Sequence, residues 1–159
     1  YYDTVKIETT ATKSGTKPGG QGPKPVAPAP PPVVVNVPAM YSYHADSEHY
    51  CIIVLPGVDS RTPKLKQSIR ELSASKYAAA DLNMLLDLYN IDQGVLVIRK
   101  FANAALAKAF KDDLLASQVF EGYAPGEIHV MTISTQNYRK MYSDKKAEPY
   151  AGFYKANYP

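Results

Sequence analysis

His49 and Cys51 have side chains that could do chemistry together, and they lie two positions apart in the apolar run from His49 to Leu55. Because side chains two apart on a β-strand point to the same face, the pair could begin a metal site or a thiolate–imidazole pair. The sequence offers no third ligand at a metal-binding spacing and no second cysteine. The pattern therefore favours a buried cysteine beside a histidine at the end of a strand.

The acidic residues do not form a catalytic pattern. His44, Asp46 and Glu48 alternate, but their position beside a predicted linker favours a solvated edge. The other carboxylates fall on different predicted elements, so no two have the spacing that glycosidic acid–base catalysis requires; they are Asp81, Asp87, Asp112 and Asp113. Nucleophile elbows, phosphate-binding glycine loops and zinc-peptidase helices do not occur in the sequence. We therefore expect a protein that is not an enzyme and uses no cofactor or metal.

Tyrosines and basic residues are concentrated near the C-terminal end of the chain. Tyrosine offers a large contact area at low entropic cost and is typical of binding surfaces. Some of the rings should seal the last helices onto the sheet, with Phe153 as a buried anchor. The remainder should form a partner-binding or glycan-stacking surface with the neighbouring cations. The candidate partner-binding residues are Tyr138, Arg139, Lys140, Tyr142, Tyr154, Lys155 and Tyr158.

Composition limits the class of protein. The chain has 159 residues with 13 prolines, 13 tyrosines and no tryptophan, enough for one domain of about 100–120 residues and a tail. A net charge of +3 is close to balance and argues against a nucleic-acid partner. The segment Val95 to Phe101 also lacks the glycine–aromatic pattern of RNA-binding strands. We expect no transmembrane segment, because no apolar run is long enough to span a bilayer.

Residues 9–40 are rich in Pro, Gly, Lys and Ala, which predicts a disordered linker, flexible through its glycines and extended through its prolines. Residues 1–8 would then be the end of an upstream region, and residues 41–159 the folded domain. One segment of the linker favours a strand and could add to a sheet edge in this domain or in a partner. It contains Val33, Val34, Val35 and Val37.

The folded region predicts alternating strands and helices. Apolar runs and alternation indicate strands at 49–55, 82–89, 95–101 and 127–133. A hairpin turn is expected at 90–94, because Asn90 and Asp92 favour turns and Gly94 tolerates positive φ.

Helices are expected after Thr62, which can act as a cap, and after the cap Asn103, with Leu106, Phe110 and Leu114 facing the sheet. Two more should follow Ser134 or Thr135 and begin at Pro149. The predicted fold class is α+β: a ferredoxin-like βαββαβ sheet with two helices on one face, extra C-terminal helices and a disordered N-terminal arm.

The chain ends in Ile133-Ser134-Thr135-Gln136-Asn137-Tyr138, an Asp144-Lys145 step, Tyr150, and Phe153-Tyr154-Lys155-Ala156-Asn157-Tyr158. This pattern resembles the C-terminal domain of the tetratricopeptide-repeat lipoproteins that Bacteroidetes use for gliding motility and type IX secretion, the SprE/PorW group. The likeness extends upstream to about His49, and with the lack of an initiating Met it implies a piece of a longer protein. It also implies a non-catalytic docking module that binds other envelope proteins of the secretion or gliding machinery. The implied location is the periplasm, at the outer membrane, through an upstream lipid anchor.

The segment Gly94 to Asn103 and the alanine-rich helix after it also resemble SPOR domains, which carry the pattern V-x-V-G-x-F-x-x-x-x-x-A. Arg99 or Lys100 stands in place of the glycine of that pattern. SPOR domains are ferredoxin-like modules that bind glycan strands of peptidoglycan. Peptidoglycan binding is therefore the alternative function.

Overall fold

The structure is a computed structural model that describes residues 40–158. Met40–Pro159 forms one compact unit. The predicted upstream end, the linker up to residue 39 and the strand-addition segment with Val33, Val34, Val35 and Val37 lie outside the described residues. Among the described residues, no helix combines the length and the apolar character needed to cross a membrane.

The sheet confirms the predicted α+β, ferredoxin-like fold. Its four antiparallel strands are β1 (His49–Leu55), β2 (Asn83–Asn90), β3 (Gln93–Phe101) and β4 (His129–Ser134), in the order β2-β3-β1-β4. Helix α1 (Thr62–Lys76) and the short 3-10 turn η1 (Ala78–Ala80) connect β1 to β2, and α2 (Ala104–Ala116) connects β3 to β4. Each helix thus crosses over to a strand that is not adjacent to the one before it, which is the split βαβ arrangement.

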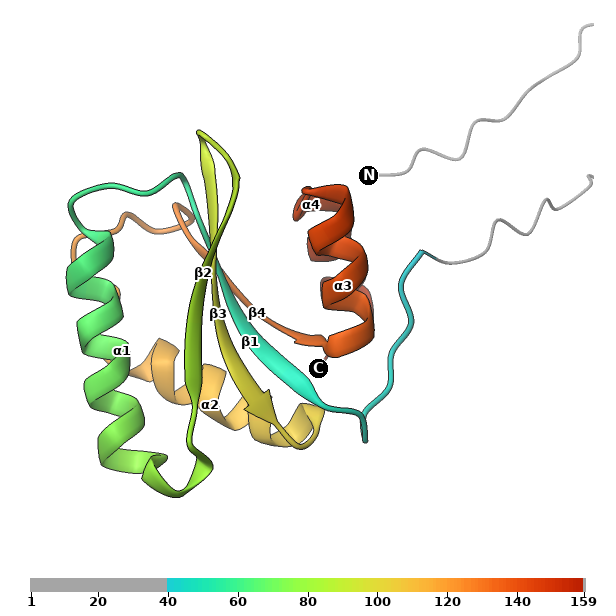
Figure 1. Ribbon diagram of the computed structural model, residues 1–159, viewed down its shortest axis with the longest axis horizontal. Helices are drawn as coiled ribbons and strands as arrows, with labels where there is room; N and C mark the ends of the chain where they lie inside the picture. Colours follow the sequence, from blue (N-terminus) through green and yellow to red (C-terminus); the bar gives the residue numbers. More distant parts are fainter. Residues whose placement is uncertain (1–39, 159) are drawn as a thin grey trace, which may run out of the picture. The chain divides into compact units, whose positions relative to one another are not determined.

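Helices cover both faces of this sheet. Figure 1 shows α1 and α2 on one side, and α3 (Thr135–Asp144) and α4 (Glu148–Asn157) on the other. In β1, Cys51, Ile53 and Leu55 pack toward α1 and α2, while Tyr50, Ile52 and Val54 belong to the core beneath α3 and α4. All seven residues of β1 are buried. The double cover explains why this strand is an unbroken apolar run rather than an alternating one.

Local capping explains where two helices begin. The side chain of Asn103 accepts a hydrogen bond from the Leu106 N–H at 2.9 Å, and Ser134 accepts one from the Asn137 N–H at 3.3 Å. Both residues therefore act as the predicted N-caps. Thr62 does not, because α1 already includes Thr62 and Arg61 occupies the N-cap position. The Thr62 hydroxyl instead accepts from the Asp59 N–H at 3.2 Å, which orders the turn before the helix.

The predicted inner face of α2 was wrong at one position. Leu106 is exposed, because α2 buries Ala104, Ala107, Phe110 and Leu114 and places Leu106 off that face.

Gly94 lies inside β3 and is not among the glycines at positive φ. A Cβ on Gly94 would come within 3.1 Å of Val58 Cγ2, so glycine permits a close approach there rather than a turn. Asn90 and Asp92, which were also predicted to favour this turn, do order it: the Asn90 side chain accepts from the Asp92 N–H at 2.8 Å.

Candidate interaction surface

His49 and Cys51 have separate structural roles. Cys51 is fully buried in the core under α1 and α2, and burial raises the pKa of its thiol to about 12. The neutral thiol is therefore a small buried apolar group. Among residues 40–158, no three His, Cys, Asp or Glu side chains are grouped so that they could hold a metal ion.

His49 is buried, and both of its ring nitrogens have partners. Nδ1 lies 2.7 Å from the Ser47 carbonyl oxygen, and Nε2 lies 2.9 Å from the Tyr158 hydroxyl. A carbonyl can only accept, so Nδ1 carries the proton and donates it to Ser47. Burial lowers the pKa of His49, which favours the neutral ring, and Nε2 then accepts from the Tyr158 hydroxyl. The histidine thus ties the end of the described chain to the start of β1.

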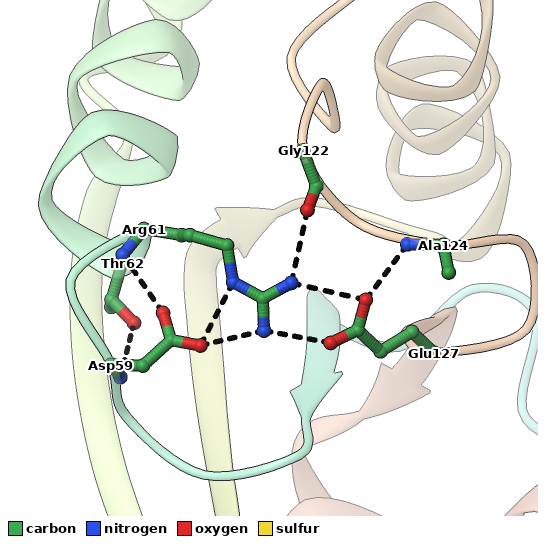
Figure 2. A network of polar contacts seen from close by, with 6 residues as sticks. All are labelled: Asp59, Arg61, Thr62, Gly122, Ala124 and Glu127. Atoms are coloured by element: carbon green, nitrogen blue, oxygen red, sulfur yellow. Dashed lines mark hydrogen bonds and ion pairs between the residues drawn. The ribbon is translucent and has the colours of Figure 1, made fainter.

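Arg61 joins two loops at one end of the sheet, a contact that sequence reasoning missed. Figure 2 shows its guanidinium between the carboxylates of Asp59 and Glu127. Its Nη2 donates to Asp59 Oδ2 at 2.6 Å and to Glu127 Oε1 at 2.7 Å, and Nη1 donates to the Gly122 carbonyl at 2.9 Å. The Tyr123 ring centroid lies 4.2 Å from the guanidinium carbon.

This network is saturated. Arg61 Nε donates to Asp59 at 2.8 Å and Nη1 also reaches Glu127 at 3.1 Å, so every nitrogen of the guanidinium is engaged. Hydrogen bonds from Arg61 lower the pKa of both Asp59 and Glu127. The group therefore connects the β1–α1 loop to the α2–β4 loop and leaves no free donor for an anionic ligand.

Three of the candidate binding tyrosines hold the α3–α4 layer to the rest of the domain. The Tyr138 hydroxyl donates to Asp87 of β2, Tyr154 accepts from the Lys111 ammonium at 3.0 Å, and Tyr158 donates to His49. Their rings are half-buried. Tyr150, rather than the partly buried Phe153, is the fully buried anchor of α4.

The other candidates lie at the surface. Arg139 and Lys140 of α3 and Lys155 of α4 are exposed, and none of them forms an ion pair within the described part of the chain. Tyr142 is also exposed and lies three residues after Arg139, so the two share one side of α3.

Lys145 extends this surface. Its ammonium lies 3.3 Å from the centroid of the Tyr142 ring and 5.1 Å from that of Tyr89. A cation over an aromatic face is attracted by the ring quadrupole, so the contact orders both groups. Sequence reasoning missed Lys145, although the pair Lys145-Lys146 at the end of a predicted helix was a signal. We call Arg139, Lys140, Tyr142 and Lys145 the α3 surface; it could bind an acidic segment of another protein.

The first described residues lie against the same layer. The side-chain amide of Asn137 donates to the Ser42 carbonyl at 2.7 Å, and its oxygen accepts from the Ser42 N–H at 3.2 Å. Tyr41 is buried, with its ring centroid 5.1 Å from that of Tyr150. The chain therefore enters the domain at a defined place beside α3 and α4.

Comparison of the chain with protein-family models, with curated proteins and with solved structures gave no match in any of the three.

Proposed function

We propose that this domain is a non-catalytic docking module that binds another protein through the α3 surface. The observation that carries the proposal is that Arg139 and Lys140 are exposed without an ion pair in the described region, and that the exposed Tyr142 shares one side of α3 with Arg139. Cations that are not held in an internal ion pair are available to a partner carboxylate, and an adjacent aromatic ring adds apolar contact area. The buried residues Asn137 and Met141 support these side chains from the inner side of α3.

The sequence resemblance suggests who the partner is. It implies another envelope protein of the type IX secretion or gliding machinery, reached from the periplasmic side of the outer membrane. The α3 surface adds a chemical constraint, since the binding segment of that partner should be acidic. Association through such a surface should weaken with salt, because exposed charges are screened within about 10 Å at 0.1 M ionic strength.

The test compares two variants that change net charge equally. In the first, Arg139→Glu is combined with Lys140→Glu. In the control, Arg70→Glu is combined with Lys100→Glu, which reverses two exposed cations elsewhere that form no ion pair within residues 40–158. We expect both variants to unfold at the wild-type temperature. Only the first should lose co-purification with the secretion or gliding complex from envelope extracts. Equal capture of both variants would rule out the α3 surface.

Peptidoglycan binding is the other outcome of this experiment. Each variant is also sedimented with purified peptidoglycan. If the chain sediments with peptidoglycan and does not co-purify with the envelope complex, the SPOR-like alternative replaces protein docking as the proposed function.

A further inference from the structure

The two edges of the sheet, β2 and β4, differ in how they are protected. An edge strand carries unpaired N–H and C=O groups that can pair with another chain. Natural proteins therefore cover such edges, charge them or interrupt them with proline. The contrast between the two edges indicates which one is an interface.

The β4 edge is covered. The Thr135 N–H donates to the Glu48 carbonyl at 3.0 Å, in register with the β1–β4 ladder. Because hydrogen-bonded and non-hydrogen-bonded pairs alternate along an antiparallel ladder, the Thr132 carbonyl, opposite Cys51, points away from β1 toward the edge. There it accepts the Tyr150 hydroxyl at 2.6 Å.

A second contact also protects β4. The Lys111 ammonium donates to the Tyr154 hydroxyl at 3.0 Å and so joins α2 to α4. These helices lie on opposite faces of the sheet and both contact β4. The bridge between them therefore passes around the β4 edge, which prevents another strand from pairing there.

Nothing in residues 40–158 protects the β2 edge in this way. Apart from the ladder with β3, no backbone group of residues 83–89 is hydrogen-bonded within the described region. The strand contains no Lys, Arg or Pro, and its one charged residue, Asp87, accepts the Tyr138 hydroxyl. Leu85 and Leu88 are exposed on it. These are the features of a strand that pairs with another strand.

We propose that β2 pairs antiparallel with β2 of a second copy of this chain, so that the two sheets become one across a two-fold axis. In such a pair the axis passes between the two copies of one residue, which lie opposite each other. Leu85 is the residue whose choice gives favourable side-chain pairs. It places Asn83 opposite Asp87, Met84 opposite Leu86 and Leu82 opposite Leu88. An axis at Asp87 would place two carboxylates opposite each other, and an axis at Leu86 would place the apolar Leu85 opposite the charged Asp87. Both arrangements are unfavourable. This dimer does not depend on the partner proposed for the α3 surface.

The first test measures the mass of the full chain over a range of concentrations by sedimentation velocity. We expect a concentration-dependent dimer. Leu85→Lys would place two ammonium groups on the axis and should raise the dimer dissociation constant about tenfold or more. Ile91→Lys is the matched control, because it makes the same change in the hairpin turn, outside the proposed pairing. Ile91 is 88% exposed and Leu85 is 40% exposed. A chain that stays monomeric, or a dimer lost in Ile91→Lys, would overturn the proposal.

The second test reads the register and does not depend on the stability of a charged variant. Leu85→Cys should form an intermolecular disulfide under mild oxidation, since the two copies of residue 85 face each other on the axis. Leu88→Cys, although more exposed, faces Leu82 and should cross-link much more slowly. The native Cys51 is buried and will not interfere. Equal rates for the two variants would contradict this register.

Discussion

The hydroxyl of Tyr150 in α4 donates a hydrogen bond of 2.6 Å to the main-chain carbonyl of Thr132 in β4. Both residues are fully buried. The Tyr150 hydroxyl thus provides a hydrogen-bond donor for the Thr132 carbonyl, which points away from β1 at the edge of the sheet. This contact attaches α4 to the sheet and also covers the sheet edge.

Loss of this contact should reduce stability measurably. Tyr150→Phe keeps the ring but leaves the Thr132 carbonyl buried without its partner, so we expect a loss of about 1–3 kcal/mol. Tyr150→Ala should cost about 3–5 kcal/mol, as for other large aromatic residues in cores. Phe153→Ala is the comparison, and it should cost less because Phe153 is only partly buried. Urea unfolding followed by circular dichroism measures all three; a larger loss for Phe153→Ala than for Tyr150→Ala would contradict the assignment of the anchor.

The boundary of the folded unit can be tested by truncation. Removal of residues 1–38 should change the free energy of unfolding little, since the composition of that stretch predicts a linker. Removal of residues 1–43 should destabilise the domain, because Tyr41 is buried and Ser42 is bonded to Asn137 through two hydrogen bonds. Asn137→Ala should reproduce part of that loss. Equal melting temperatures for the two truncations would show that Tyr41 and Ser42 add nothing to the fold.

His49 should make stability depend on pH. Its pKa is lowered by burial from an ordinary value of 6.5, so the folded state keeps it neutral while the unfolded state takes up a proton first. The contribution is therefore complete above about pH 6.5 and is lost as pH falls toward the folded-state pKa. His49→Gln should flatten this part of the profile of unfolding free energy against pH. An identical slope in the variant would assign the dependence to other groups.

The Arg61 network should contribute at neutral pH and fade in acid. The pKa of Glu127 is lowered from 4.5 by the hydrogen bond from Arg61, so the stabilisation is present above that value and is lost as pH falls through the folded-state pKa. Glu127→Gln should therefore lower the melting temperature at pH 7 and have a smaller effect at strongly acidic pH. Glu121→Gln is a suitable control, since the Lys64–Glu121 pair is highly exposed and should contribute little. Equal decreases in melting temperature for the two variants at pH 7 would contradict a stabilising role of the Arg61 network.

Cys51 should react slowly in the folded protein. Its thiol is buried and has a pKa of about 12, so very little thiolate is present or accessible at pH 8. A water-soluble alkylating reagent should label it at the rate of unfolding, and denaturant should accelerate the labelling. Native-state labelling as fast as that of a free thiol would show that the core around β1 opens without unfolding.

The features that could be read from the sequence depend on residues close together in the chain. The strand His49–Leu55 was predicted with its observed bounds because its nearly continuous apolar run is typical of a strand buried on both faces. Asn103 was predicted as a cap and Ser134 as one of two candidates, and each accepts a hydrogen bond from a backbone N–H three residues away. The βαββαβ order then leads to the observed strand order, since short connections and right-handed crossovers leave few alternatives.

Tertiary structure alone decided which of the candidate side chains remain at the surface. Nothing local distinguishes Tyr142, which is exposed, from Tyr138, whose hydroxyl is bonded to Asp87 across 51 positions of sequence. The same holds for His49 and Tyr158, which are 109 positions apart, and for Arg61 and Glu127, which are 66 apart. Helical periodicity limits which residues of α2 can face the sheet but does not choose between Leu106 and Ala107. The packing of α2 in the folded domain buries Ala107 and leaves Leu106 exposed. Whether a side chain stays at the surface depends on the partners that the fold brings to it, and these partners are found through space rather than along the chain.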